Sequence, residues 1–128
     1  MPIKKTSSAH PKRTSPASSP GFHGRVWVDG PDGTFIGYGR VVLLERIIEH
    51  GSITQAAKSM KIAYRRAWDL VDSMNQQARH PFVVLATGGK GGGGARVTEE
   101  GRRAIKVFRQ FHRDFEAFLK KEEKRLKF

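Results

Sequence analysis

The chain has 128 residues and a mass of 14.3 kDa, enough for one domain with a single modest core. Its 24 Lys and Arg against 12 Asp and Glu give a formal net charge of +12, a balance that favours a polyanionic partner. The absence of cysteine excludes disulfides, cysteine-ligated zinc and thiol catalysis, and no apolar run approaches the roughly 20 residues of a membrane span.

The first 20 residues differ from the rest in composition. They hold four of the six prolines, four basic residues, no acidic residue and hardly any bulky apolar side chain. Such a segment cannot bury enough surface to offset its ordering entropy, so we expect a disordered basic tail over 1–20 and a folded domain over 21–128. The tail is either a basic arm that follows DNA or an inert extension. The rest of the chain keeps 20 basic against 12 acidic residues, so the charge bias does not come from the tail alone.

A short hairpin and a helix are predicted next. Residues 25–28 and 34–36 alternate around the turn sequence DGPDG, which is typical of two short strands, and we assign Trp27 to the core or to an interface. A helix is predicted from about Tyr38 to His50 because apolar residues recur there at helical spacing. Its predicted inward face consists of Val42, Leu43, Ile47 and Ile48.

A helix-turn-helix pattern follows. Ser52 with Gln55 three residues later is a capping box, which predicts a helix over 53–60. A tight turn with Ile62 as its buried residue leads to a third helix over about 64–78. The predicted inward residues of the two helices are Ala56, Ala57, Met60, Ala67, Val71 and Met74.

The third helix is predicted to enter a major groove of duplex DNA, because the second helix of such a motif meets base edges with its first turns. Arg65 and Arg66 lie in those turns, and an arginine fork can bind guanine O6 and N7 together. The outward residues expected to face DNA are Tyr64, Arg65, Arg66 and Asp69. Ser52, Thr54 and Gln55 are expected to contact a phosphate at the start of the preceding helix. The alternative is a solvated basic face on an ordinary helical bundle, and Trp68 remains open between the core and DNA contact.

A glycine-rich hairpin comes next. The apolar strand 82–85 is predicted to pair with 95–97 across a loop in which six of the seven residues 88–94 are glycine. Glycines let the backbone approach a phosphate, and Lys90 at the tip supplies a cation, so Lys90 and Arg96 are assigned to the DNA contacts. A phosphate-binding loop of the nucleotide-binding type is excluded because the required G-x-x-x-x-G-K-[ST] register is missing. The remaining alternative is a hairpin without contacts.

A long last helix is predicted over about 99–126, with Thr98 as its N-cap and acidic residues in its first turn. Apolar residues recur along it at alternating three- and four-residue intervals, the pattern of a seam between helices. We assign this seam to a dimer interface made by Phe108, Phe111, Phe115 and Phe118. The alternative is that the helix folds back on the first helix of the same subunit.

The sequences AWDLVDSMNQ (67–76) and ATGGKGGGGARVTEEG (86–101) resemble the DNA-binding domain of the molybdate-responsive ModE regulators, which is similar to the winged helix-turn-helix of LysR-type regulators. The resemblance spans about 25–119 and implies a dimeric regulator that binds a palindromic operator. Tyr64, Ala67, Trp68 and Asp69 keep the residue types of that family. Ala63 and the pair Arg65-Arg66 depart from it, so the operator sequence does not carry over. Because only 120–128 follow the helical seam, the resemblance implies no oxyanion effector on this chain.

The prediction from sequence is therefore a mainly α protein with a small β component (α+β), a winged helix-turn-helix with a long C-terminal dimerisation helix. We expect a cytoplasmic, sequence-specific DNA-binding regulator, a homodimer without a membrane partner or cofactor. The alternative is a non-specific or architectural nucleic-acid-binding protein, which salt dependence and competition with random DNA would distinguish. An enzyme is not expected, because the five histidines lie at no ligand spacing and no catalytic set is indicated.

Overall fold

The computed structural model describes residues 20–86 and 94–127. Nearly all of the predicted tail, and the glycine loop with Lys90, lie outside the described residues. Along the chain the elements are β1 (Val28–Gly30), β2 (Gly33–Ile36), α2 (Tyr38–His50), α3 (Ile53–Met60), α4 (Tyr64–Gln77), β3 (Val83–Ala86), β4 (Gly94–Val97), α5 (Glu99–Glu122) and a 3-10 turn (Glu123–Arg125). The predicted α+β class with a long C-terminal helix is confirmed.

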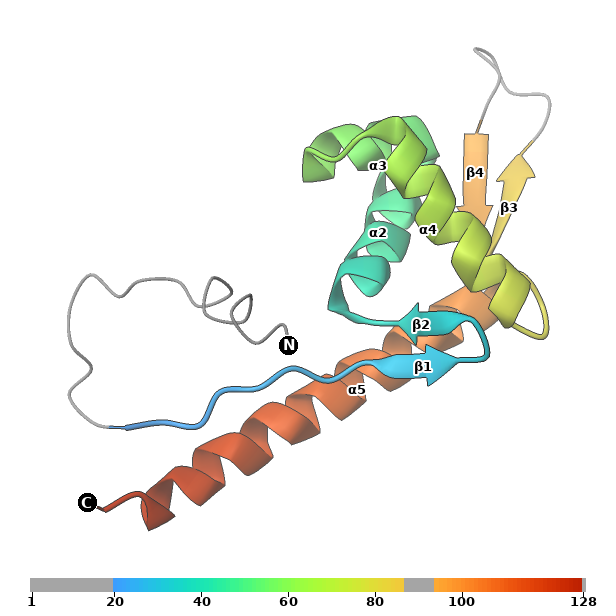
Figure 1. Cartoon of the computed structure of the whole chain (residues 1–128). Helices are drawn as coiled ribbons and strands as arrows, with labels where there is room; N and C mark the ends of the chain where they lie inside the picture. The colour runs from blue at the N-terminus through green and yellow to red at the C-terminus, as the bar shows by residue number, and fades with distance from the viewer. Residues whose placement is uncertain (1–19, 87–93, 128) are drawn as a thin grey trace, which may run out of the picture.

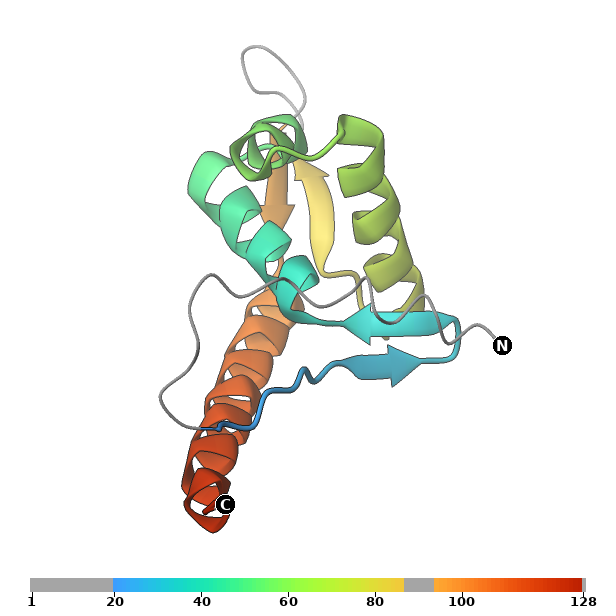
Figure 2. The same ribbon diagram turned by 60° about the vertical axis from the view of Figure 1, so that its left-hand side comes forward.

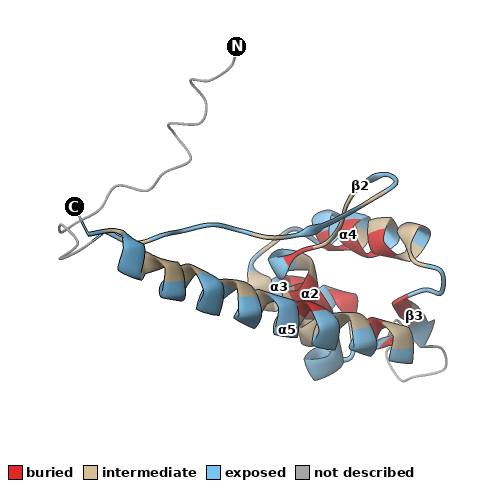
Figure 3. Ribbon diagram, turned by 90° about the horizontal axis from the view of Figure 1, so that it is seen from below, coloured by how far each residue is buried: buried red, intermediate tan, exposed pale blue. Residues whose placement is uncertain are grey.

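The core lies where α2, α3 and α4 meet the β3–β4 hairpin (Figures 1 and 3). As predicted, Ala56 and Ala57 are buried, and so are Ala67, Val71 and Met74. The inward face of α2 was predicted in part: Leu43 and Ile47 are buried as expected, whereas Val42 is only half-buried. Its buried residues are Val41, Leu43, Leu44 and Ile47, whereas Ile48 is 37% exposed. The reason is that α2 contacts α3 on one side and α5 and β4 on others, and helical spacing alone does not fix which apolar line faces inward.

The first hairpin is shorter than predicted. Strand β1 begins only at Val28, because residues 20–27 run alongside the distal half of α5 instead of pairing with β2 (Figures 1 and 2). A Cβ on Gly24 would lie 3.0 Å from the ring of Phe115, which shows how closely this segment approaches α5. Trp27 is not in the core: it is 54% exposed, and its indole N–H donates to Asp29 Oδ1 at 3.0 Å.

Three contacts fix α5 against the rest of the fold. Thr98 caps it by accepting from the backbone N–H of Gly101 at 3.1 Å, as predicted. Gly101 itself is buried against Phe82 and Val97 of the second hairpin. About two turns further, the Arg109 guanidinium donates to both carboxylate oxygens of Glu45 on α2, at 3.0 and 2.6 Å. The hydrogen bonding to Glu45 is the main reason that the pKa of Arg109 is raised above its usual value.

Candidate nucleic-acid interface

The turn between α2 and α3 places the start of α3 at the surface. Gly51 ends α2 with φ of 73°, in the left-handed region that favours glycine. Ser52 Oγ then accepts from the backbone N–H of Gln55 at 2.9 Å, so the predicted N-cap is confirmed. The hydroxyl is used as an acceptor in this cap. Thr54 and Gln55 are exposed on the first turn, where the positive end of the helix favours an anion.

Helix α4 has a sharply divided surface. Ala67, Leu70, Val71 and Met74 are buried in the core. On the opposite side of the helix, the predicted DNA contacts are all exposed: Tyr64, Arg65, Arg66 and Asp69. The helix begins after Ala63, which provides no side-chain cap, so its first backbone N–H groups remain available to an external acceptor such as a phosphate.

The two adjacent arginines of α4 point in different directions. At about 100° per residue, Arg65 lies at the middle of the exposed face, and Arg66 lies on the flank with Ser73 and Gln77. That flank faces the start of α2 and the first hairpin, because Ser73 Oγ accepts from Arg40 at 2.9 Å and Gln77 Nε2 donates to Thr34 O at 3.0 Å. Sequence reasoning treated Arg65 and Arg66 as equivalent, and the structure separates them.

Trp68 packs partly against the core and makes an edge-on contact with Tyr64 at 6.2 Å between ring centroids. Within the part of the chain that the structure describes, its buried Nε1 has no hydrogen-bond partner. The sequence left Trp68 open between core and DNA contact. The structure places the side chain at the edge of the core.

Asn75 fixes the position of the second hairpin relative to α4, and sequence reasoning missed it. Its Oδ1 accepts from the backbone N–H of Phe82 at 2.8 Å and from that of Val83 at 3.2 Å, and its Nδ2 donates to Val83 O at 2.9 Å. The hairpin is held from the other side by a bond from Ala95 N to Gly51 O at 2.9 Å. The hairpin and α4 therefore form one unit. Nothing in the sequence singles out Asn75 beyond a polar residue beside the inward line of α4.

The described part of the second hairpin agrees with the predicted wing. Strands β3 and β4 are antiparallel, with Val83 opposite Val97 and Val84 opposite Arg96. Arg96 is exposed, as is Leu85 (58%). The hairpin points away from α5, beside α4 (Figures 1 and 2). The contact expected from Lys90 lies outside the described residues.

The phenylalanines of α5 divide into two faces, and this corrects the predicted seam. Phe108 is only 2% exposed because it packs within the same chain, so it is not available to a partner. Phe115 is half-buried beneath the segment that contains Gly24. Phe111 and Phe118 are exposed by 46% and 55%. With Val107, 60% exposed, they form a separate line, which we call the second apolar face; Figure 3 shows how little of distal α5 is buried.

In residues 20–86 and 94–127 no helix is long and apolar enough to cross a membrane. The same ranges hold no group of three or more His, Asp or Glu residues arranged to bind a metal ion.

Comparisons with known proteins agree with this geometry. The chain is 38% identical over 105 residues to the molybdenum transport protein ModE of Azotobacter vinelandii, covering 82% of this chain and 39% of that protein. It is 49% identical over 69 residues to the DNA-binding transcriptional dual regulator ModE of Escherichia coli K12, covering 54% and 26%. It is 44% identical over 73 residues to the molybdenum-pterin-binding protein MopA of Rhodobacter capsulatus, covering 57% and 28%. The chain thus spans well under half the length of these relatives. No protein-family model matches it.

Proposed function

We propose, from the premise that this chain is a relative of the ModE regulators, that it is a transcriptional regulator which binds duplex DNA and acts on molybdenum-related genes. The E. coli relative is named as a DNA-binding transcriptional regulator, and the Azotobacter relative as a molybdenum transport protein. The relationship supports the class of function. The surface of α4 supports the mode of binding.

The observation that carries the proposal is the exposed face of α4. A rigid core stands behind it, Arg65 projects from its middle, and no carboxylate pairs with Arg65 in the described ranges. An unpaired guanidinium on a rigid helix matches the fork that reads guanine in a major groove. Thr54 and Gln55 on α3 and Arg96 on β4 are exposed, and they supply contacts to the phosphate backbone of the DNA.

The regulator acts as a homodimer on a palindromic operator. The second apolar face supports this part of the proposal, because three large apolar side chains on one line of α5 are exposed in the single chain. A second copy related by a two-fold axis would cover the same face on both chains. Two α4 helices would then meet the duplex about 34 Å apart, one turn of B-DNA, or a multiple of it.

A selection experiment tests sequence-specific binding. Duplexes enriched by the protein from a random pool should share an inverted repeat and bind at least roughly 1,000-fold more tightly than random duplex. Arg65→Ala should reduce binding to the selected duplex by about 5- to 150-fold and relax the preference at one base pair per half-site. Equal loss on selected and random duplex would refute the groove assignment, and the absence of any enriched sequence would favour the non-specific alternative.

Sedimentation tests the dimer. Phe111→Ala with Phe118→Ala should shift the mass of the protein toward monomer, whereas Ile48→Ala, which shortens an exposed apolar residue on α2, should leave it unchanged. A wild-type protein that is monomeric at tens of micromolar would contradict the proposed interface.

A further inference from the structure

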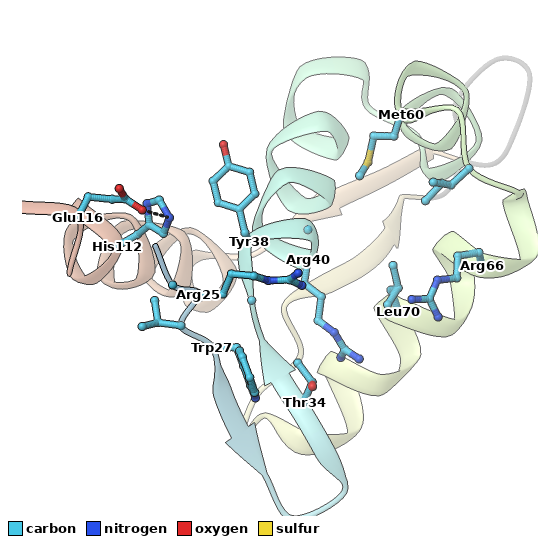
Figure 4. Close-up of a pocket in the computed structure, with 15 residues that line it drawn as sticks. Arg25, Trp27, Thr34, Tyr38, Arg40, Met60, Arg66, Leu70, His112 and Glu116 are labelled. Carbon is cyan, nitrogen blue, oxygen red and sulfur yellow. Dashed lines mark ion pairs between the residues drawn. The ribbon is translucent and has the colours of Figure 1, made fainter. Parts of the chain in front are cut away.

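An open groove of about 910 Å³ lies beside α4 and carries an excess of positive charge. It is bounded by α4, the start of α2, the first hairpin and α5 (Figure 4). Three arginines line it, and we call it the arginine groove: Arg25, Arg40 and Arg66. Trp27 and Tyr38 contribute aromatic walls.

Arg40 and Arg66 line this groove from two different elements. Arg66 reaches from α4 and Arg40 from the first turn of α2 into the same hollow (Figure 4). Arg40 is oriented by the hydrogen bond from its guanidinium to Ser73 Oγ at 2.9 Å, one of five N–H donors that an arginine carries. The Arg66 side chain makes no hydrogen bond with the described residues.

The positive charge is not neutralised from within the described residues. Neither Arg40 nor Arg66 forms an ion pair in the described ranges, and the acidic residue of the groove, Glu116, lies 3.7 Å from His112 instead. Burial and, second, the nearby charge of Arg66 lower the pKa of Arg40. Two guanidinium groups brought together without a counter-charge cost free energy, which an anion placed between them would recover.

We propose that Arg40 and Arg66 together bind one phosphate group of the DNA backbone. This phosphate lies at the edge of the DNA major groove that α4 enters. The proposal rests on the proposed function. It divides the two adjacent arginines by role: Arg65 reads a base, and Arg66 positions the helix. In this arrangement the first hairpin and the start of α2 also lie next to the DNA, a role that the sequence did not predict for them.

The shape of the groove favours a polymer backbone over a small ligand. Tyr38, Gly39 and Arg66 are all exposed, so a small anion bound there would stay in water and be held weakly. A DNA phosphate is delivered to the site by the other contacts of α4. Flank residues of a helix lying in a major groove face the phosphates of one strand, and Arg66 lies on that flank.

Glutamine substitutions test the pair because they remove the charge and keep most of the side chain. Arg40→Gln and Arg66→Gln should each weaken binding by about 5- to 20-fold, equally on selected and random duplex. The double variant should lose less than the product of the two single losses, because both arginines hold one phosphate. Its slope of log affinity against log salt should decrease by about 0.9, the value for one phosphate contact. The Arg40→Lys variant, which keeps the positive charge, should show the salt slope of the wild-type protein.

Arg113→Gln is the matched control. Arg113 is an exposed arginine on distal α5 that does not line the groove, so its substitution removes the same charge elsewhere. Thermal unfolding should show that all variants fold. Losses at Arg40 and Arg66 no larger than the loss at Arg113 would overturn the proposal, and so would a loss at Arg66 confined to the selected duplex.

Neutral methylphosphonate linkages locate the phosphate. One linkage per half-site should weaken binding of the wild-type protein and have no effect on the double variant; the absence of any such linkage would overturn the proposal. Inorganic phosphate that binds the wild-type chain but not the double variant, with duplex affinity unchanged in that variant, would assign the groove to a free phosphate ligand instead. Because the variants are compared on random duplex too, a failure to find any preferred sequence refutes the proposed function and leaves this test interpretable.

Discussion

Replacing Gly101 by alanine tests how closely α5 must approach the second hairpin. The added Cβ would lie 2.7 Å from the carbonyl oxygen of Phe82 and 2.7 Å from Cγ1 of Val97. Ordinary contact begins near 3.4 Å, so one side must move by about 0.7 Å. The carbonyl cannot move freely, because it accepts from the backbone N–H of Thr98 at 2.8 Å. Overpacking of this kind costs about 1–3 kcal/mol, and alanine gains roughly 1 kcal/mol over glycine in a helix, so the expected net loss is up to about 2 kcal/mol.

Thermal unfolding followed by circular dichroism measures this cost. For a domain of this size each kcal/mol lowers Tm by about 4–8 °C, so Gly101→Ala should lower Tm by several degrees at equal protein concentration. Gly39→Ala is the matched control: Gly39 also lies in a helix, and a Cβ there meets nothing within 4 Å. That variant should be as stable as the wild type or slightly more stable. If the two variants have the same Tm, the close approach does not constrain the fold.

Three further predictions concern other contacts. Asn75→Ala leaves the backbone groups of Phe82 and Val83 without their partner and should cost about 2–3 kcal/mol, read as a lower urea midpoint; an unchanged midpoint would show that the hairpin holds its place without Asn75. Arg109→Gln removes the half-exposed pair with Glu45 and should cost about 1 kcal/mol in the same assay, an effect that Glu45→Gln should match. Calorimetric titration of the 128-residue chain with molybdate should give the same weak signal as sulfate, and a tight, selective signal would place oxyanion sensing on this chain.

Local signals predicted the helices well. The N-cap at Ser52, the cap at Thr98 and the alanines at helical spacing each depend on residues close in sequence, and all three were confirmed. Such signals carry their own geometry, because a cap or a buried stripe is defined within a few residues.

What the sequence did not predict depends on contacts between distant segments. Residues 25–27 were predicted as part of a strand by alternation, but they belong to the segment 20–27, which packs along α5 around Phe115. Phe108 belongs to the same predicted stripe as Phe118, and only the folded chain shows that the first is covered and the second is not. Arg65 and Arg66 are neighbours in sequence and are distinguished only by what lies beside the flank of α4.

The pair between Arg109 and Glu45 has a geometric consequence for a dimer joined through α5. The helix extends 13 residues beyond Arg109 to Glu122, about 20 Å at 1.5 Å per residue. A tilt of about 10° at the pair would therefore displace the distal end by about 3.5 Å, close to the roughly 3.4 Å rise of one base pair. In such a dimer, the angle of α5, which this pair fixes together with the Thr98 cap and the buried Gly101, would affect the number of base pairs between half-sites. Substitutions that alter this angle would change operator spacing without touching a residue that contacts a base.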